Sequence, residues 1–490
     1  MKSYPGKKNI ILLFLLAFTV KFLTAIFIRY LLSCTPVGYH LDELVIRGDD
    51  YLSYNGAMEN YIQTGHYYFF NGRHNVFAGR LPHYSLLYFI FRQFLNVPLA
   101  NFGVLVAQIG LECLAILCLA MLATKVTHVR RSFWMTYILY LLSLATSFYN
   151  IIVLPDSFSV SLLIIFSYFF YEYLKRPSFR RLLLPGVFLG LTVVLKPYFS
   201  LIYLVVGFFF LRETNQLFSR KGLMAVAVKT LVVSIPLLLL LLPWVVRNYQ
   251  LYHRFIPFQE SIIAGYNYTQ ADLACRRYIH TFGHDFLYWD EKSAAYYFKS
   301  CRQNCSFKLP DYLFTEKYGR NEIEAVRSKY LQLQANFSDA QDLEVAAAFD
   351  ALTNDFRQEK PFRYYIISHF QALGNFLMDN GAVNLPISRS SVCFHKFHLL
   401  IKYIQVFLYW ISVTLGFIGL YWLAKKDRHT LLFLAIPVYL LLFFPVILLA
   451  TEGRYFIHSY PFLILGLVYF IQKLNLKVRR RVTARLMASK

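Results

Sequence analysis

The residues of this 490-residue chain best suited to chemistry are acids between positions 42 and 50. They form two pairs of neighbouring residues, Asp42-Glu43 and Asp49-Asp50. Two cations of the same predicted loop, Arg47 and Arg80, could lie close to them. Adjacent carboxylates repel each other, which raises the pKa of one member unless a cation lies close by. Such a group can act as a general base or can bind an ion. The simpler alternative is an acidic loop exposed to solvent.

Four basic residues complement these acids because they are expected at the outer membrane face: Arg80, Lys196, Arg247 and Arg454. A charge in or near the hydrocarbon is costly, so it usually has a partner or a function. The last three also have a structural explanation, namely a lysine extended toward the interface, a helix terminus and a local pair with Glu452, respectively. Several cations with a carboxylate suit a phosphate leaving group and an acceptor that must lose a proton. At a membrane face, that phosphate is expected to belong to a lipid.

The elements that must position these residues are transmembrane helices. Hydrophobic residues make up 57% of the chain, above the roughly 45–50% of soluble domains. Apolar runs of about 20 residues, long enough to cross a bilayer, recur along the sequence. They predict an all-α polytopic membrane protein with about ten spans, near 9–33, 99–123, 132–151, 157–174, 182–196, 197–211, 224–246, 399–423, 430–450 and 455–472. The short pair over 182–211 predicts a hairpin that turns at Lys196-Pro197.

The distribution of charge predicts an orientation. Of the net charge of +23, most comes from alternate segments that hold 23 Lys and Arg but only two acids, namely 1–8, 124–131, 175–181, 212–223, 424–429 and 473–490. By the positive-inside rule these segments, and with them both termini, are cytoplasmic. Residues 34–98 (the first loop) and 247–398 (the second loop) are then exoplasmic and nearly neutral. The charge therefore reflects topology, and no nucleic-acid partner is expected.

Six parts are predicted along the chain: a signal-anchor helix, a first exoplasmic catalytic loop, transmembrane helices, a second exoplasmic loop subdomain, C-terminal transmembrane helices and a basic cytoplasmic tail, over 1–33, 34–98, 99–246, 247–398, 399–472 and 473–490. Lys21 and Arg29 share one face of the first helix, and they either face protein or extend to the interface. Apolar residues recur at helical spacing over 316–360. One or two disulfides are possible among Cys275, Cys301, Cys305 and Cys393.

Other signals narrow the range of functions. No Walker-type lysine motif occurs, which argues against nucleotide hydrolysis. No internal repeat is seen, which weakens a transporter built from duplicated halves. His66, His74 and His83 could bind a divalent cation beside the acids, or they could be ordinary surface histidines. No other cofactor and no fixed metal site is expected.

At these residues the chain resembles the polyprenyl-phosphate-sugar-dependent glycosyltransferases of the GT-C superfamily. The branch it looks most like contains the bacterial relatives of protein O-mannosyltransferase (glycosyltransferase family 39) and the lipid A aminoarabinose transferase. Four motifs in order carry the resemblance: Gly48-Asp49-Asp50 with Tyr54, Ala57 and Gly65; Arg80-Leu81-Pro82-His83-Tyr84; Gly190 through Lys196-Pro197; and Pro243-Trp244 with Arg247-Asn248, followed far downstream by Glu452, Arg454-Tyr455 and Pro461. Residues 265–360 have no counterpart in the motifs of this family.

The resemblance implies a GT-C-like helical bundle with two large exoplasmic loops, in a bacterial plasma membrane. It also implies that the catalytic acid lies four residues before Tyr54, at Asp50, with Asp49 as the alternative because the pair makes the register ambiguous. Substrate-binding roles fall to a set that surrounds these acids: Tyr54, Arg80, His83, Lys196, Arg247, Glu452, Arg454 and Tyr455. In relatives the basic residue directly precedes proline, whereas here Leu81 separates Arg80 from Pro82.

The expected reaction is transfer of a sugar from a polyprenyl monophosphate to an exoplasmic acceptor, with inversion. Asp50 would take the proton of the acceptor hydroxyl, and the cations would hold the departing phosphate. The acceptor could be a lipid, as in lipopolysaccharide modification, a cell-envelope glycan or a protein. The alternatives are a multi-pass transporter, a flippase of lipid-linked glycans, a glycan polymerase that uses diphosphate donors, and a receptor without enzymatic activity.

Overall fold

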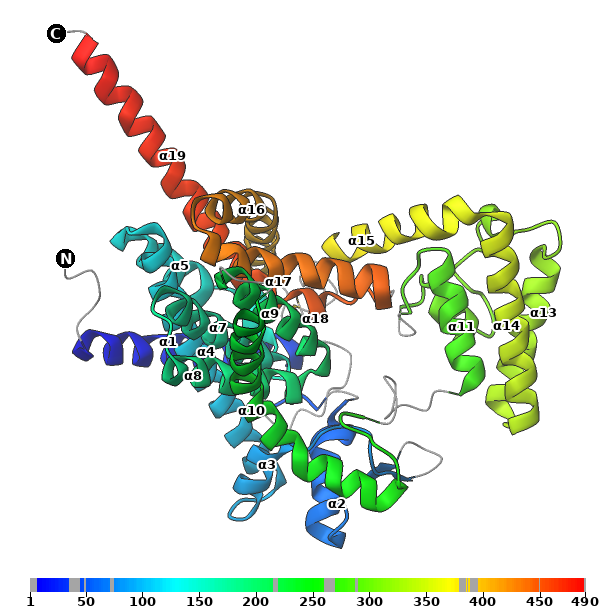
Figure 1. Cartoon of the computed structure of the whole chain (residues 1–490). Coiled ribbons are helices and arrows are strands. Elements are labelled where there is room, and N and C mark those ends of the chain that lie inside the picture. The colour runs from blue at the N-terminus through cyan, green and yellow to red at the C-terminus, as the bar shows by residue number, and fades with distance from the viewer. Residues whose placement is uncertain are drawn as a thin grey trace. The chain divides into compact units, whose positions relative to one another are not determined.

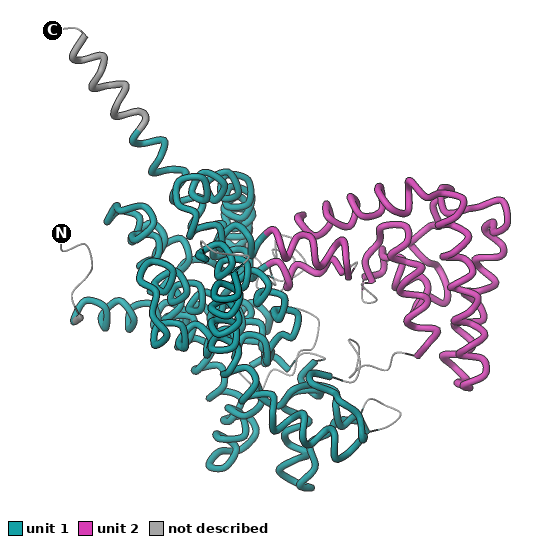
Figure 2. Tube along the Cα trace, in the orientation of Figure 1, with its two compact units in different colours: residues 1–265, 380–437, 457–490 teal, residues 266–379, 438–456 magenta. Residues whose placement is uncertain are grey.

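The computed structural model describes residues 7–34, 45–47, 50–70, 75–214, 219–259, 269–286, 290–378, 385, 387, 395–448 and 450–488. The described part is almost entirely helical (Figure 1), with one two-stranded antiparallel sheet of β1 (Phe69–Phe70) and β2 (Asn75–Val76). The chain divides into two compact units (Figure 2). Unit 1 comprises 1–265, 380–437 and 457–490, and unit 2 comprises 266–379 and 438–456.

Among the described residues, six helical segments are long and apolar enough to cross a membrane. They correspond to α1 (Lys7–Ser33), α4 (Val97–Thr127), α7 (Asp156–Lys175), α10 (Arg220–Tyr252), α16 (Lys396–Lys426) and the continuous run of η5 (Arg428–Thr430), α17 (Leu431–Leu442) and η6 (Phe443–Leu448). A helix bonds its own backbone polar groups internally, which is the condition for crossing hydrocarbon. The chain is therefore an all-α membrane protein.

The other expected spans coincide with shorter helices: α5 (Arg130–Leu141), α6 (Leu144–Phe148), α8 (Phe179–Leu195), η2 (Pro197–Leu201), α9 (Ile202–Glu213), α18 (Gly453–Phe456) and α19 (Tyr460–Ala488), whose apolar part is 460–476. The break expected at Lys196-Pro197 is confirmed: α8 stops at Leu195, Lys196 has extended backbone angles, and Pro197 opens η2. The hairpin of two spans over 182–211 stays a prediction. The total of ten spans stays a prediction.

A buried ion pair joins two of the long helices. Lys21, near the middle of α1, is 0% exposed, and its Nζ lies 2.9 Å from Oε1 of Glu112, near the middle of α4. The ammonium also donates to Ser147 Oγ at 2.8 Å, and Asn150 Nδ2 donates to the other carboxylate oxygen of Glu112 at 2.5 Å. Lys21 therefore faces protein, as one of the two sequence alternatives held, and Arg29 is buried as well.

This ion pair explains why the chain breaks where one continuous span was expected, over 132–151. That expectation is wrong: α5 ends at Leu141 and α6 begins at Leu144. The Lys21 ammonium donates to the carbonyl oxygens of Tyr140 and Ser143, at 3.3 and 3.4 Å. A buried ammonium needs several acceptors, and carbonyls released by a helix break supply them.

Helices α16 and α19 cross in close contact because glycines line their contact. A Cβ atom at Gly416 would lie 2.5 Å from the carbonyl oxygen of Leu463, and one at Gly419 would overlap the carbonyl oxygen of Gly466. Small residues let helix backbones approach each other in membranes, where packing replaces the hydrophobic effect as the driving force. The crossing therefore depends on the absence of side chains at these positions.

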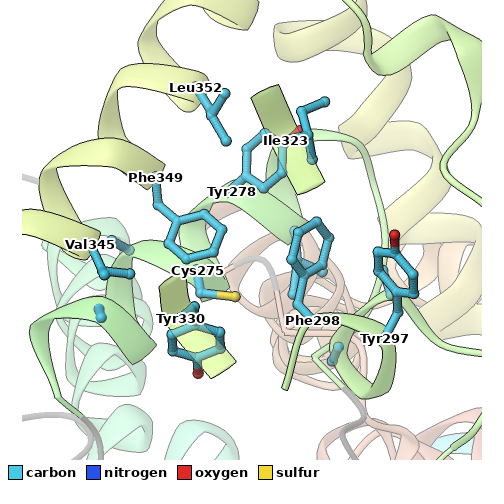
Figure 3. Packing of buried hydrophobic residues seen from close by; sticks show 14 of the residues in the cluster. Cys275, Tyr278, Tyr297, Phe298, Ile323, Tyr330, Val345, Phe349 and Leu352 are labelled. Carbon is cyan, nitrogen blue, oxygen red and sulfur yellow. The ribbon is translucent and has the colours of Figure 1, made fainter. Parts of the chain in front are cut away.

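Unit 2 contains its own core. Its helices are α11 (Gln270–Thr281), α12 (Ala294–Lys299), η3 (Asp311–Leu313), α13 (Arg320–Ala335), α14 (Asp339–Glu359), η4 (Arg363–Ile367) and α15 (Ser368–Met378). Aromatic side chains of α11, α12, α13 and α14 meet in the centre (Figure 3), among them Tyr278, Phe298, Tyr330 and Phe349. The helical spacing seen over 316–360 corresponds to α13 and α14. This core gives the segment a fold of its own between membrane helices.

The structure settles the state of three of the four cysteines considered for disulfides. Cys301 and Cys305 form a disulfide, which the sequence had allowed. Cys275 is a free thiol, fully buried in the aromatic core, so it acts as a small apolar side chain there. Cys393 lies outside the described residues.

Replacement of Lys21 by Met should destabilise the protein by about 3–5 kcal/mol, because it leaves Glu112 buried without its cation. Adding Glu112→Gln to Lys21→Met should restore most of the loss, since Gln still accepts from Asn150. Thermal unfolding of the detergent-solubilised protein, followed by size-exclusion chromatography, measures both. A Lys21→Met protein that unfolds at the wild-type temperature would contradict the structural role of the pair.

Replacement of Gly419 by Ala should destabilise the protein by about 1–3 kcal/mol, the usual cost of overpacking. Gly110→Ala in α4 is the matched control, because a Cβ atom there meets nothing within 4 Å. In that position Ala should be neutral or stabilise by up to about 1 kcal/mol through its helix propensity. The same thermal assay compares the two, and equal unfolding temperatures would argue against the close helix crossing.

Candidate functional site

The centre of the candidate site is an ion pair in the first loop. Asp50 is 8% exposed, and its Oδ1 lies 3.7 Å from Nη2 of Arg80. The backbone carbonyl of Asp50 accepts from the amide and hydroxyl of Ser53, which fixes the turn into η1 (Leu52–Gly56) and α2 (Ala57–Thr64). The Arg80 guanidinium lies 5.3 Å from the centre of the Tyr54 ring. The structure thus brings together three residues that the sequence selected; Asp49 lies outside the described residues.

An aromatic wall continues from Tyr54 toward the membrane helices. The rings of Tyr54 and Tyr84 meet edge to face at 5.5 Å, and Tyr84 meets Phe158 of α7 in the same way at 5.9 Å. The Tyr84 hydroxyl donates to Gln108 Oε1 in α4 at 2.8 Å. Burial raises the pKa of Tyr84 well above its usual value, and nearby Tyr54 and Asp156 raise it further. Tyr84 therefore stays protonated and remains a hydrogen-bond donor.

A second ion pair lies beside this wall. Asp156, the first residue of α7 and 1% exposed, has its Oδ1 2.9 Å from Nζ of Lys196. The carboxylate also benefits from its place at a helix N-terminus, where the helix dipole favours negative charge. Lys196 sits at the end of α8, just before Pro197. The sequence identified the lysine but missed the acid; the visible signal was an aspartate after Pro155, at the very start of an apolar run.

A buried histidine adjoins the second pair and was also missed. His458 Nε2 lies 2.8 Å from the hydroxyl of Ser159 in α7. Its ring contacts those of Tyr198 and Phe199 in η2, with centroids 6.2 and 4.9 Å away. His458 is 0% exposed, so its local role is to hold the start of α19 against α7 and η2. Only its place in the last apolar run marked it in the sequence.

Two predicted binding residues hold the first loop against α10. Arg247 donates to the backbone carbonyls of Tyr67 at 2.7 Å and Phe77 at 2.8 Å. In the sequence, Tyr67 precedes β1 and Phe77 follows β2. His83 Nε2 lies 3.0 Å from the Leu240 carbonyl oxygen. Burial lowers the pKa of His83, although the hydrogen bond to Leu240 raises it, and the net shift is downward. A neutral His83 can donate this bond, so both residues fasten the loop that carries Asp50 and Arg80.

The remaining predicted residues belong to unit 2 and form a group of their own. Arg454 Nε lies 2.6 Å from Oε2 of Glu452, which is the local pair that the sequence offered as one explanation. The Arg454 guanidinium also lies over the Tyr455 ring, 5.2 Å from its centre. That ring stacks on Phe444 of η6, with centroids 4.3 Å apart. A guanidinium held in this way is oriented by both a carboxylate and an aromatic face.

The arrangement in unit 1 can do two things chemically. Cations in contact with carboxylates can exchange those carboxylates for an added anion, such as a phosphate, and a carboxylate released in this way can accept a proton. Aromatic rings beside them suit the apolar face of a sugar or a polyprenyl chain. Among the described residues no group of three or more His, Cys, Asp and Glu side chains could hold a metal ion. His66 is exposed, and His74 lies outside the described residues.

Comparisons with known proteins add no assignment to this geometry. No protein-family model matches the chain, and no curated protein matches it either. The grounds for a function are therefore the membrane fold and the residues that meet around Asp50 and Asp156.

Proposed function

We propose that the protein is an inverting glycosyltransferase that moves a sugar from a polyprenyl monophosphate to an acceptor at the exoplasmic face of a membrane. The observation that carries the proposal is the Asp50–Arg80 pair over Tyr54, with the Asp156–Lys196 pair beside the same aromatic wall. The reaction needs a base to take the acceptor proton and separate cations to hold the departing phosphate. The resemblance to GT-C enzymes supports the same reading.

In the proposed reaction Asp50 accepts the proton of the acceptor hydroxyl. The acceptor oxygen forms a bond to the anomeric carbon from the face opposite the phosphate, while the bond from that carbon to the phosphate oxygen breaks. The electron pair of the broken bond stays on the phosphate, which gains negative charge. Cations preset at that oxygen favour the transition state over the bound donor. A positioned base typically contributes about 10²–10⁴-fold.

Arg80 and Lys196 are the proposed phosphate ligands of unit 1. The Nη2 atom of Arg80 lies 3.7 Å from Oδ1 of Asp50, so a phosphate that binds Arg80 would compete with that carboxylate for the guanidinium. In the proposed reaction the carboxylate then acts as the base. Arg247 is a weaker candidate, because two of its donors already bond the carbonyls of Tyr67 and Phe77.

The proposed setting is a bacterial plasma membrane with both termini in the cytoplasm. The support is the concentration of 23 Lys and Arg in alternate segments, against two acids. The first loop then faces the exoplasmic side, where a polyprenyl-linked sugar and an envelope acceptor would meet. The acceptor is proposed by class: a lipid, a glycan or a protein.

A flippase or transporter is the second candidate, and one observation favours it. The Lys21–Glu112 pair lies in the middle of two membrane helices, where a transported ion or headgroup would be bound. However, the two side chains are 0% and 2% exposed, and the ammonium donates to Glu112, to the hydroxyls of Thr146 and Ser147, and to backbone carbonyls. A pair bonded in this way acts more readily as a structural link than as a transport site.

Asp50→Asn should lower the rate of sugar transfer by about 10²–10⁴-fold, because the amide cannot accept the proton. The assay supplies purified, reconstituted protein with a polyprenyl monophosphate sugar and a cell-envelope extract as acceptor source. Glu59→Gln is the matched control: Glu59 is another acid of the first loop, paired at 3.0 Å with Arg92 instead of Arg80. Near-normal transfer by Asp50→Asn would exclude this base. Movement of the donor across vesicles without any product would favour the flippase, and use of diphosphate donors alone would favour a polymerase.

Arg80→Lys should lower transfer by about 10–100-fold, the equivalent of the roughly 1.5–3 kcal/mol of a hydrogen bond to a charged group. Lysine keeps the charge but loses the planar fork that grips a phosphate. Because the phosphate gains charge in the transition state, the loss should appear in kcat and not only as a raised KM. Arg92→Lys, which alters the equivalent pair with Glu59, serves as control and should stay within about twofold of wild type. An equal effect of both changes would mean that Arg80 only supports the fold of the loop.

A further inference from the structure

A helix of the second loop carries an apolar face that the described part of the chain leaves exposed. It runs without interruption through η4 and α15, over residues 361–378. Phe362 is 67% exposed, Ile366 is 42% exposed and Phe370 is 68% exposed. Their spacing of four residues places them along one side of the helix. Tyr365 and Met378, 56% and 65% exposed, extend the apolar surface.

The opposite side of the same helix is the one packed against protein. Ser368, Ala372 and Phe376, again four residues apart, are buried. The Phe376 ring contacts Phe444 of η6 and Phe456 of α18, with centroids 6.0 and 5.4 Å away. Since η6 is the end of the run 428–448, which is long and apolar enough to cross a membrane, α15 packs against the last residues of that run.

The composition of this helix differs from that of its neighbours in unit 2. Residues 361–378 contain one charged side chain, Arg363, in 18 residues. Helix α14, which precedes it, contains seven charged residues in 21. A helix in water carries charge on its free face, as α14 does, whereas one in the interface of a bilayer presents Phe, Tyr, Leu and Ile.

We infer that the helix 361–378 lies in the surface of the lipid bilayer, with Phe362, Ile366 and Phe370 inserted among the lipids. The adjoining span 428–448 also exposes apolar side chains near its end, where Leu442 and Ile447 are 54% and 65% exposed. The bilayer that must surround the span therefore also reaches the apolar side of α15. The core of unit 2, which is built from α11 to α14, is in this way fastened to the membrane by a helix as well as by its chain connections.

The test places a fluorescent label at position 370 and measures its contact with lipid. Full-length Phe370→Cys protein is labelled with an environment-sensitive fluorophore and reconstituted in phosphatidylethanolamine–phosphatidylglycerol vesicles, some with a nitroxide on the upper acyl chain. Leu343→Cys is the matched control, because Leu343 is 62% exposed on α14 of the same unit. It lies 16 residues before the end of that helix, about 24 Å along it. Cys113, Cys118 and Cys275 are buried, and unsubstituted protein corrects for any background labelling.

The label at 370 should be quenched by the nitroxide lipid at least about fivefold more than the label at 343, as expected for a side chain inserted about 5–10 Å into the interface. Unmodified protein provides a second measurement: a photoactivatable lipid should label the peptide 361–378 and not the peptide 339–359. Equal and weak quenching at both positions, or lipid labelling of neither peptide, would overturn the inference. A dimer cross-linked through position 370 would also overturn it, since a second copy would then cover the face.

Discussion

The interaction on which the rest of unit 1 depends is the Lys21–Glu112 pair. Two charges inside a helical bundle are tolerated only if every donor and acceptor finds a partner. Satisfying the ammonium recruits carbonyls from the break between α5 and α6, and satisfying the carboxylate recruits Asn150. The pair therefore fixes α1 and α4 and also dictates the path of the irregular segment that leads into α7.

That segment continues the same network toward the candidate site. The backbone carbonyl of Asn150 accepts from Gln108 Nε2 at 2.7 Å, and Gln108 in turn accepts from Tyr84. Tyr84 packs against Tyr54, over which Arg80 lies beside Asp50. A continuous series of polar and aromatic contacts thus runs from the middle of the bundle to the first loop. In the proposed enzyme this network orients the catalytic pair, while His83 and Arg247 hold the same loop from the side of α10.

Much of this architecture could be predicted from the sequence, because apolar runs and the turn at Lys196-Pro197 are local properties. The proximity of Asp50, Arg80 and Tyr54 could also be predicted from the sequence, since all three lie in the first loop. The partner of Lys196 was not, because an ion pair between separate helices depends on how the helices pack. Asp156 carries no distinguishing local signal, because an acid is common at the first position of a helix. Similarly, no local pattern shows that the fork of Arg247 is occupied by the carbonyls of Tyr67 and Phe77.

The Asp50–Arg80 and Asp156–Lys196 ion pairs have a consequence for selectivity. Arg80 and Lys196 each carry an internal counter-ion, Asp50 and Asp156, so the resting site is close to electroneutral around these four side chains. An incoming anion must compete with a carboxylate that is already desolvated and in place. Chloride or free phosphate has only its charge and hydrogen bonds to replace those of the carboxylate. A ligand that brings additional binding energy, such as a long apolar tail in contact with the helices, can compete. Such a site would therefore resist the small anions of its surroundings and respond to a lipid-linked one.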